Sequence, residues 1–197
     1  KLFESLIQAG IDINLPKEKK LPFTFLAAEN PDLRVLDFLA ENGCDLSLGT
    51  KEENVISHAL ENNSNPNIID YLMNNNLWIK DDYLISEHIA KNPNVEVWKR
   101  LCEIGFPLTY QDENGASLLM KVFYYNAEPD IDVVKSISYE STVNLRDKYG
   151  MTASHFAAKL ADLRYLTILE QAGAYLGVRD NKFGFNPFME ACCNNPN

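Results

Sequence analysis

The chain has 197 residues, and its 28 acidic against 18 basic side chains give it a formal net charge of −10. Hydrophobic residues make up 46% of the chain, which is enough for a folded core and argues against a disordered protein. The acidity argues against nucleic acid and against anionic lipid surfaces as partners, because both attract clustered Lys and Arg.

Targeting and cysteine signals are also few. No apolar run approaches the roughly 18 residues that span a bilayer, and no secretory signal opens the chain. The four cysteines form neither a disulfide framework nor a CxxC metal site. We therefore expect free thiols in a reducing compartment, the cytosol or the nucleus, and no membrane insertion.

Two kinds of predicted helix alternate along the chain. The first helix of each pair falls in one of six segments: Leu21–Ala28, Asn54–Leu60, Tyr83–Ala90, Gly115–Phe123, Asp147–Ala158 and Asn181–Cys192. The second helix has apolar residues at helical spacing and often follows Asn-Pro or Glu-Pro; its copies are Leu2–Asn14, Asn30–Asp45, Asn65–Trp78, Asn92–Pro107, Glu128–Ser138 and Leu163–Tyr175.

The predicted ends of the second helices reveal a repeat. Subtracting successive positions gives spacings of 33, 33, 29, 36 and 32 residues for Gly10, Gly43, Asn76, Gly105, Ser141 and Gly173. Gly, and next Asn, accepts the left-handed conformation that closes a helix. So regular a period indicates stacked units rather than one globular core.

Polar stretches join the units and read as exposed loops: Lys17–Lys20, Lys51–Glu53, Lys80–Asp82, Asp112–Asn114 and Arg179–Lys182. The Asn-Pro and Glu-Pro steps lengthen the turn between the two helices of a unit. We interpret the Asn-rich helix ends and loops, such as Asn62, Asn63 and Asn65, as a compositional bias without a mechanism.

At this point the residues resemble the ankyrin repeat family. Its pattern D-x-x-G-x-T-P-L-H-x-A-A is matched by Asp147, Gly150, Thr152, His155, Ala157 and Ala158. A second match consists of Asn181, Gly184, Asn186, Pro187 and Ala191. The family's period is also near 33 residues. The resemblance covers essentially the whole chain, strongly over 112–195 and weakly over 50–91.

This resemblance implies an all-α solenoid of helix-turn-helix repeats with short projecting β-hairpins or loops. We expect one domain over 1–197, with units at 1–16 (partial), 17–49, 50–79, 80–111, 112–146, 147–179 and 180–197 (partial). Trp98 and Cys192 are predicted to be core residues. The terminal apolar residues look like core rather than polar caps, which suggests a segment of a longer array: Phe3, Leu6, Ile7, Phe188 and Met189.

No catalytic, cofactor or metal signature is present, so we expect a protein that is not an enzyme. His155 occupies the family's His position, where it is expected to bond the Thr152 hydroxyl and nearby backbone. Neither His58 nor His88 has a second His or Cys at helical spacing to complete a metal site.

The resemblance also implies where a partner would bind. In such arrays the loop tips and the exposed side of the first helices line a concave face, and aromatics are enriched in binding hot spots. Mapped onto that pattern, the C-terminal half presents an aromatic strip with basic edges: Tyr124, Tyr125, Lys148, Tyr149, Met151, Lys182, Phe183 and Phe185.

The expected function is therefore a protein–protein interaction scaffold that binds another protein through its C-terminal half, as a monomer. The alternative is a regulatory or substrate-recruiting segment of a larger enzyme or channel, because a fold does not decide a function.

Overall fold

We describe the chain from a computed structural model, in residues 9, 23–47, 49–50, 53–78, 81–160 and 162–194. The chain divides into two compact units, Lys1–Lys80 and Asp81–Asn197. The predicted stop at Gly10, and the core predictions for Phe3, Leu6 and Ile7, lie outside the described residues.

The first unit contains two helix pairs among its described residues. In it α2 (Phe23–Glu29) is followed by α3 (Arg34–Glu41), and α4 (Val55–Asn62) by α5 (Asn67–Asn74). Helix α2 packs against both α3 and α4. Each short helix buries one apolar face and gains most of its stability from these neighbours.

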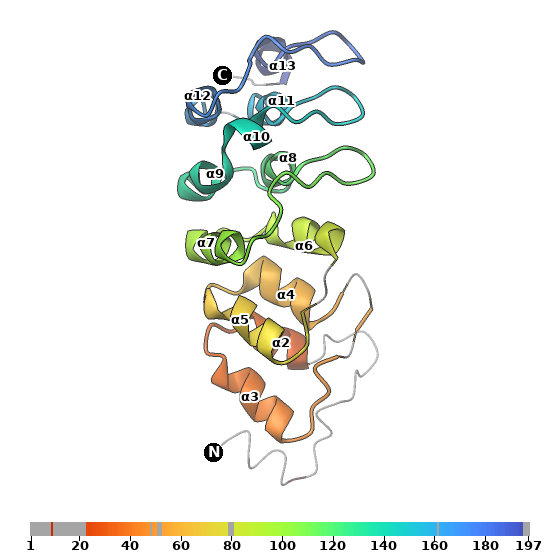
Figure 1. The fold of residues 1–197 in the computed structure, drawn as a ribbon, viewed down its shortest axis with the longest axis vertical. Helices are drawn as coiled ribbons and strands as arrows, with labels where there is room; N and C mark the ends of the chain where they lie inside the picture. The colour runs from red at the N-terminus through yellow and green to blue at the C-terminus, as the bar shows by residue number, and fades with distance from the viewer. Residues whose placement is uncertain are drawn as a thin grey trace. The chain divides into compact units, whose positions relative to one another are not determined.

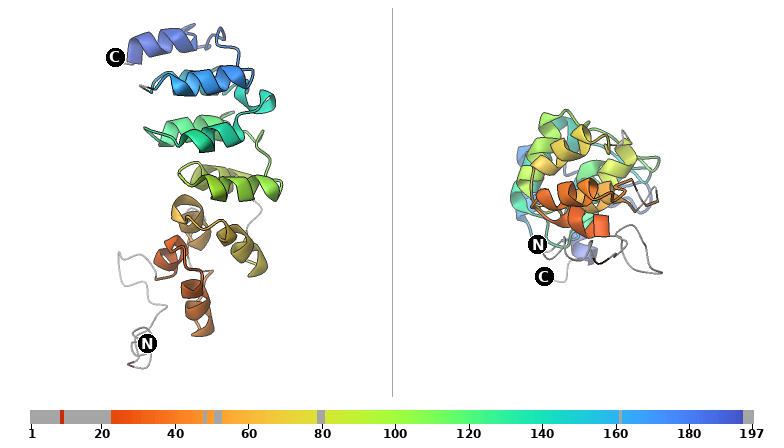
Figure 2. Two further views of the ribbon diagram at one scale, coloured as in Figure 1. Left: turned by 90° about the vertical axis from the view of Figure 1, so that its left-hand side faces the viewer. Right: turned by 90° about the horizontal axis from the view of Figure 1, so that it is seen from below.

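The second unit contains the helices of the C-terminal half. They are α6 (Asp82–Ile89), α7 (Val95–Glu103), α8 (Leu118–Tyr125), α9 (Ile131–Ile137), the short α10 (Glu140–Val143), α11 (Ala153–Ala157), α12 (Arg164–Gln171) and α13 (Pro187–Asn194). Figure 1 shows the first helices α6, α8, α11 and α13 stacked in one layer, with loops projecting from it. The second helices α7, α9 and α12 form another layer, seen in the left view of Figure 2.

The predicted all-α class is confirmed. In the described part of the chain, β structure is limited to two isolated bridges, Gly49 with Asn54 and Gln111 with Ser117. The projecting segments are thus mostly tight loops, each returning the chain to a first helix.

The helix ends follow the predicted residues at four of the described positions. Gly43, Asn76, Gly105 and Gly173 all have positive φ, as helix-closing residues do. The prediction for Ser141 is wrong. Helix α9 ends at Ile137, and Ser141 lies inside α10, which begins where the Tyr139 N–H donates to Thr142 Oγ1 at 2.9 Å.

The core prediction is confirmed for Trp98 and wrong for Cys192 and Phe188. Trp98 is fully buried in α7, and its indole N–H donates to the Asn92 carbonyl at 2.9 Å. Cys192 is exposed instead of buried, and so is Phe188 at 73%. Helix α13 packs against α11 and buries Pro187 and Glu190. Phe188 and Cys192 lie on the opposite face, because each residue turns the helix by about 100°.

The Asn residues that follow first helices join successive units, which corrects their interpretation as a compositional bias. Asn63 is fully buried, and its amide donates to the carbonyls of Ala28 (2.6 Å) and Asn30 (2.8 Å) in the preceding pair. In the second unit the Asn126 amide donates to the Ala90 carbonyl at 2.8 Å. In both units, therefore, a side-chain amide after a first helix hydrogen-bonds to the backbone of the preceding repeat.

His155 takes its predicted structural place at the start of α11. The Thr152 N–H donates to Nδ1 at 3.0 Å, and the Thr152 hydroxyl lies 3.1 Å from the same nitrogen. The proton of the neutral ring is thereby assigned to Nε2, which lies 3.1 Å from the Phe185 carbonyl. Burial lowers the pKa of His155 below its ordinary value of 6.5, despite the opposing pull of the Phe185 carbonyl and Asp180.

We predict that Asn63→Ala lowers the free energy of unfolding by about 1–3 kcal/mol, because it removes the donor to the buried Ala28 carbonyl and to the partly buried Asn30 carbonyl. Asn62→Ala is the matched control: this amide is exposed and makes only long contacts, so its cost should stay within about 0.5 kcal/mol. Urea unfolding of both variants measures the difference. Equal losses would contradict the inter-unit role of Asn63.

We also predict that His155 makes the free energy of unfolding decrease as the pH is lowered. Its pKa is lower folded than unfolded, so the unfolded chain binds more protons as pH drops below 6.5, and stability is lost in that direction. Urea midpoints taken between about pH 7 and about pH 5.5 should fall more for the wild type than for His155→Gln. The same fall in both proteins would show that His155 is not the responsible group.

Candidate functional site

The candidate site lies where the loops before α8 and α11 meet the first helices of the second unit. Each loop is closed by a carboxylate. Asp112 Oδ1 accepts the N–H groups of Asn114 (2.8 Å) and Ala116 (3.0 Å). Asp147 Oδ1 accepts those of Tyr149 and Met151, both at 2.9 Å.

Glycine completes both loops and explains two of the motif positions. Gly115 and Gly150 have φ of +73° and +75°. This left-handed conformation favours glycine at both positions, and a Cβ at Gly115 would also lie 3.0 Å from the Asp147 Cα. Gly184 has φ of +70° in the next loop, and Pro187 begins α13.

In the last loop the closing carboxylate belongs to Asp180, not to Asn181 as the motif match suggested. Asp180 Oδ1 accepts the N–H groups of Lys182 and Phe183, and Oδ2 accepts that of Phe185, at 2.6–2.7 Å. Burial alone would raise the pKa of Asp180, but these three bonds hold it below its usual value. This loop is one residue longer than the two before it, so counting back from Gly184 by the motif spacing reached Asn181 instead of Asp180.

Neighbouring loops are hydrogen-bonded to one another through their backbones. The Lys148 N–H donates to the Asn114 carbonyl at 2.8 Å, and the Asn181 N–H donates to the Tyr149 carbonyl at 2.7 Å. The Arg146 guanidinium adds a bond to the Arg179 carbonyl at 2.8 Å. The three loops therefore present their tips as one supported row.

A cavity of about 500 Å³ lies between this row and helices α6, α8 and α11. Its walls combine aromatic rings and methionines with three carboxylates and two lysines. The lining residues are Tyr83, Glu87, Asp112, Asn114, Ala116, Met120, Lys121, Tyr124, Tyr125, Asp147, Lys148, Tyr149, Met151 and Phe156.

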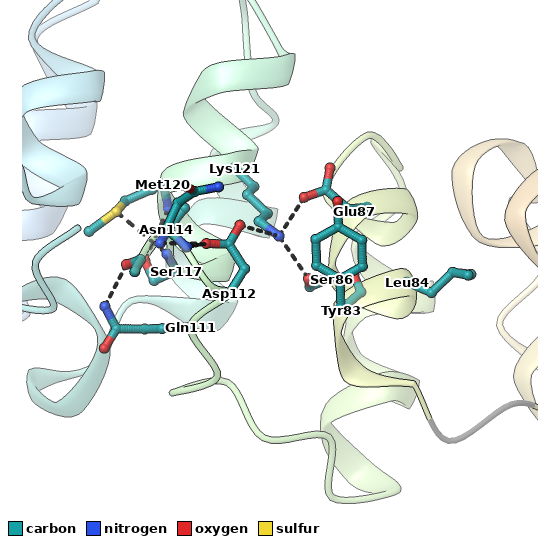
Figure 3. Close-up of polar contacts among 12 residues, drawn as sticks. Tyr83, Leu84, Ser86, Glu87, Gln111, Asp112, Asn114, Ser117, Met120 and Lys121 are labelled. Carbon is teal, nitrogen blue, oxygen red and sulfur yellow. Dashed lines mark hydrogen bonds and ion pairs between the residues drawn. The ribbon is translucent and has the colours of Figure 1, made fainter. Parts of the chain in front are cut away.

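Lys121 is the buried charge at the base of this pocket (Figure 3). Its side chain is 5% exposed, and its ammonium lies 2.5 Å from Glu87 Oε1 and 3.2 Å from Asp112 Oδ2. It also donates to Ser86 Oγ at 3.0 Å and stands 5.0 Å from the centre of the Tyr83 ring. Lys121 thus joins α8 to α6 and to the base of the first loop.

Tyr125 extends this network to the surface of α8. Its hydroxyl donates to Glu87 Oε2, so the two oxygens of Glu87 serve different partners. Burial, followed by this bond and the charge of Glu87, raises the pKa of Tyr125 well above its ordinary range. The phenol is therefore a hydrogen-bond donor at all physiological pH values.

Lysine ammonium groups cover most of the tyrosine rings in the pocket. Besides Lys121 over Tyr83, the Lys91 ammonium lies 5.3 Å from the Tyr125 ring centre, and that of Lys148 lies 5.1 Å from the Tyr149 ring centre. Such distances are within the range of cation–π attraction. Tyr124 packs edge-on against Tyr125 and is 70% exposed.

The structure brings five of the eight predicted contact residues into this pocket: Tyr124, Tyr125, Lys148, Tyr149 and Met151. Lys182, Phe183 and Phe185 lie on the next loop instead, where the Lys182 ammonium is 4.8 Å from the Phe183 ring centre. Sequence reasoning missed Tyr83, Glu87 and Lys121. Lys121 is the one charged residue of α8, and nothing in one sequence pairs it with Tyr83 or Glu87, which lie 34 or more residues away.

The described residues also bear on metal binding and membrane insertion. No group of three or more His, Cys, Asp and Glu in that part of the chain is placed to hold a metal ion. None of the helices described is both long and apolar enough to cross a membrane.

Comparison with known proteins gives three results. No protein-family model matches the chain. A fowlpox virus (strain NVSL) protein named as an ankyrin repeat protein, FPV222, is 26% identical over 168 residues. That match covers 68% of this chain and 22% of the relative, so the chain spans about a fifth of the length of the curated relative that it matches.

Solved structures have the same fold. The crystal structure of the human ASB11 ankyrin repeat domain superposes with a TM-score of 0.72 at 17% identity, covering 95% of this chain and 85% of that one. A chain of the complex between the predatory endopeptidase Bd0816 from Bdellovibrio bacteriovorus and the immunity protein Bd3460 gives 0.65 at 21% identity, covering 89% and 93%.

We predict that Lys121→Met lowers the free energy of unfolding by about 2–4 kcal/mol, because Glu87 and Asp112 then lose their shared cation. Adding Glu87→Gln and Asp112→Asn should recover most of the loss, since the amides keep acceptors for Tyr125 and the loop. Urea unfolding of the single and triple variants measures this. A triple variant no more stable than the single one would contradict the charge argument.

Proposed function

We propose that this chain, which has the ankyrin repeat fold and resembles that family, is a non-enzymatic interaction domain that binds another protein through the loop tips and first helices of its second unit. The observation that carries the proposal is the pocket in which Tyr83, Tyr124, Tyr125 and Tyr149 converge. Tyrosine buries a large area on binding at a small entropic cost, which makes such a cluster unusual on a surface that contacts only water.

The support for the loops favours the same surface. Their carboxylate closures and the bonds between neighbouring loops hold the tip side chains in place before any partner arrives. A surface that is already ordered loses less entropy on docking than a mobile one.

The proposed surface continues onto the third loop. Phe183 is exposed there, and its ring centre lies 5.7 Å from that of Phe185. Because Asn181 bonds to the Tyr149 carbonyl, this pair neighbours the pocket. We propose that Lys182, Phe183 and Phe185 extend the contact with a longer partner segment, and that the chain binds it as a monomer.

We predict that Tyr124→Ala combined with Tyr149→Ala weakens partner binding by about tenfold or more, the loss typical of hot-spot tyrosines. Peptides selected from a random display library against the 197-residue chain serve as partners, with affinities measured by calorimetry. Both rings are exposed, so the fold, checked by circular dichroism, should be unchanged.

The matched control replaces Tyr139 and Tyr175, which are also exposed tyrosines of the second unit but do not line the pocket. Their replacement by Ala should leave affinity within about twofold, as expected for residues outside a hot spot. Equal losses in the two double variants would contradict the proposal. A selection that yields no peptide for the wild-type chain would contradict it as well.

A further inference from the structure

We infer that the pocket receives a cationic side chain, arginine or lysine, from the partner; this rests on the proposed function and names the chemistry of the bound residue. The pocket joins two features that together suit a cation. Its walls are tyrosine rings, and its base holds more carboxylates than ammonium groups.

The charge balance is the first argument. Three carboxylates (Glu87, Asp112 and Asp147) line the pocket against the ammonium groups of Lys121 and Lys148, and a third ammonium, that of Lys91 over the Tyr125 ring, balances the charge around the pocket as a whole. At the base, however, there is a local negative excess, because Glu87 and Asp112 share the single ammonium of Lys121. An excess charge in a partly desolvated hollow attracts a counter-charge more strongly than it would in water.

Lys121 cannot reverse this preference by binding an anion. An ammonium group has three donors, and three acceptors already surround this one: Ser86 Oγ, Glu87 Oε1 and Asp112 Oδ2. Its charge is therefore directed into the protein. An anionic ligand would have to displace one of these partners.

The aromatic rings supply the second argument. Three tyrosines of the pocket each have a lysine of this chain over the ring, so their faces already act as cation sites. In the described part of the chain no Lys or Arg stands over Tyr124, the most exposed of the four. Met151 and Phe156, both half-buried, offer apolar surface for the aliphatic part of a long basic side chain.

The opposite preference, for an acidic partner segment, would rely on the lysines at the loop tips. Lys148 is exposed, but its ammonium donates to Asn114 Oδ1 at 2.6 Å and lies over the Tyr149 ring. It therefore supports the contact between two loops. For a cationic ligand it is a repelling charge at the rim, so the effect of removing it distinguishes the two kinds of partner.

The test uses the peptides selected above and their variants. Each Arg is replaced by citrulline, which has nearly the same shape without the charge, and each Lys by norleucine. We expect one basic position at which replacement weakens binding about tenfold, the size of a desolvated charge-assisted contact. Glu87→Gln should weaken binding of the parent peptide severalfold and leave binding of the neutral peptide unchanged. If Glu87→Gln misfolds, Asp147→Asn takes its place with the same expected result.

Lys148→Met shows whether the pocket prefers a positive or a negative ligand charge. It should bind the parent peptide as tightly as the wild type or more tightly, because a like charge has been removed. The inference is overturned if every neutral replacement keeps full affinity, if Glu87→Gln affects charged and neutral peptides equally, or if the peptides are acidic and lose binding with Lys148→Met. Any of these results leaves the proposed function standing, because that function is tested separately, by the selection of peptides and by the tyrosine variants.

Discussion

Each projecting loop in residues 81–194 depends on a carboxylate that accepts its backbone N–H groups. Asp112, Asp147 and Asp180 perform this role in successive loops. A tight loop with few internal backbone bonds would otherwise expose several unpaired donors and adopt many conformations. Because the closed loops are rigid, each can bond to the one before it. The position of Tyr149 opposite helix α8, and hence the pocket itself, follows from these bonds.

Much of the fold could be predicted from the sequence because its determinants are local. Apolar residues at helical spacing locate the short helices, and a residue able to adopt positive φ ends several of them, Gly43, Gly105 and Gly173 among these. The same locality explains His155, whose contacts with Thr152 lie within three residues. Where a local signal was ambiguous the prediction failed: at Ser141 a short extra helix intervenes, and at Asp180 the loop is one residue longer.

The pocket was only half predictable, for a physical reason. Exposed aromatics at loop tips follow from the repeat pattern, which is how Tyr124 and Tyr149 could be named. Lys121 could not, because lysine in a helix is usually solvated and its burial depends on Ser86 and Glu87 in the preceding unit. The same holds for Asn63, whose bonds between units are to carbonyls 33 and 35 residues away in the sequence.

A buried ion cluster below a binding surface is a costly way to stabilise a repeat, since apolar residues of similar volume often serve at least as well. Its geometry suggests what it does instead. Lys121 lies over the Tyr83 ring, and Glu87 accepts a hydrogen bond from the Tyr125 hydroxyl, so one cluster orients two of the pocket's tyrosines. Orientation by directional bonds restricts those rings before binding, which apolar packing alone does less sharply. The same cluster leaves one carboxylate in excess, so the device that orders the aromatic walls also sets the charge that a ligand meets there.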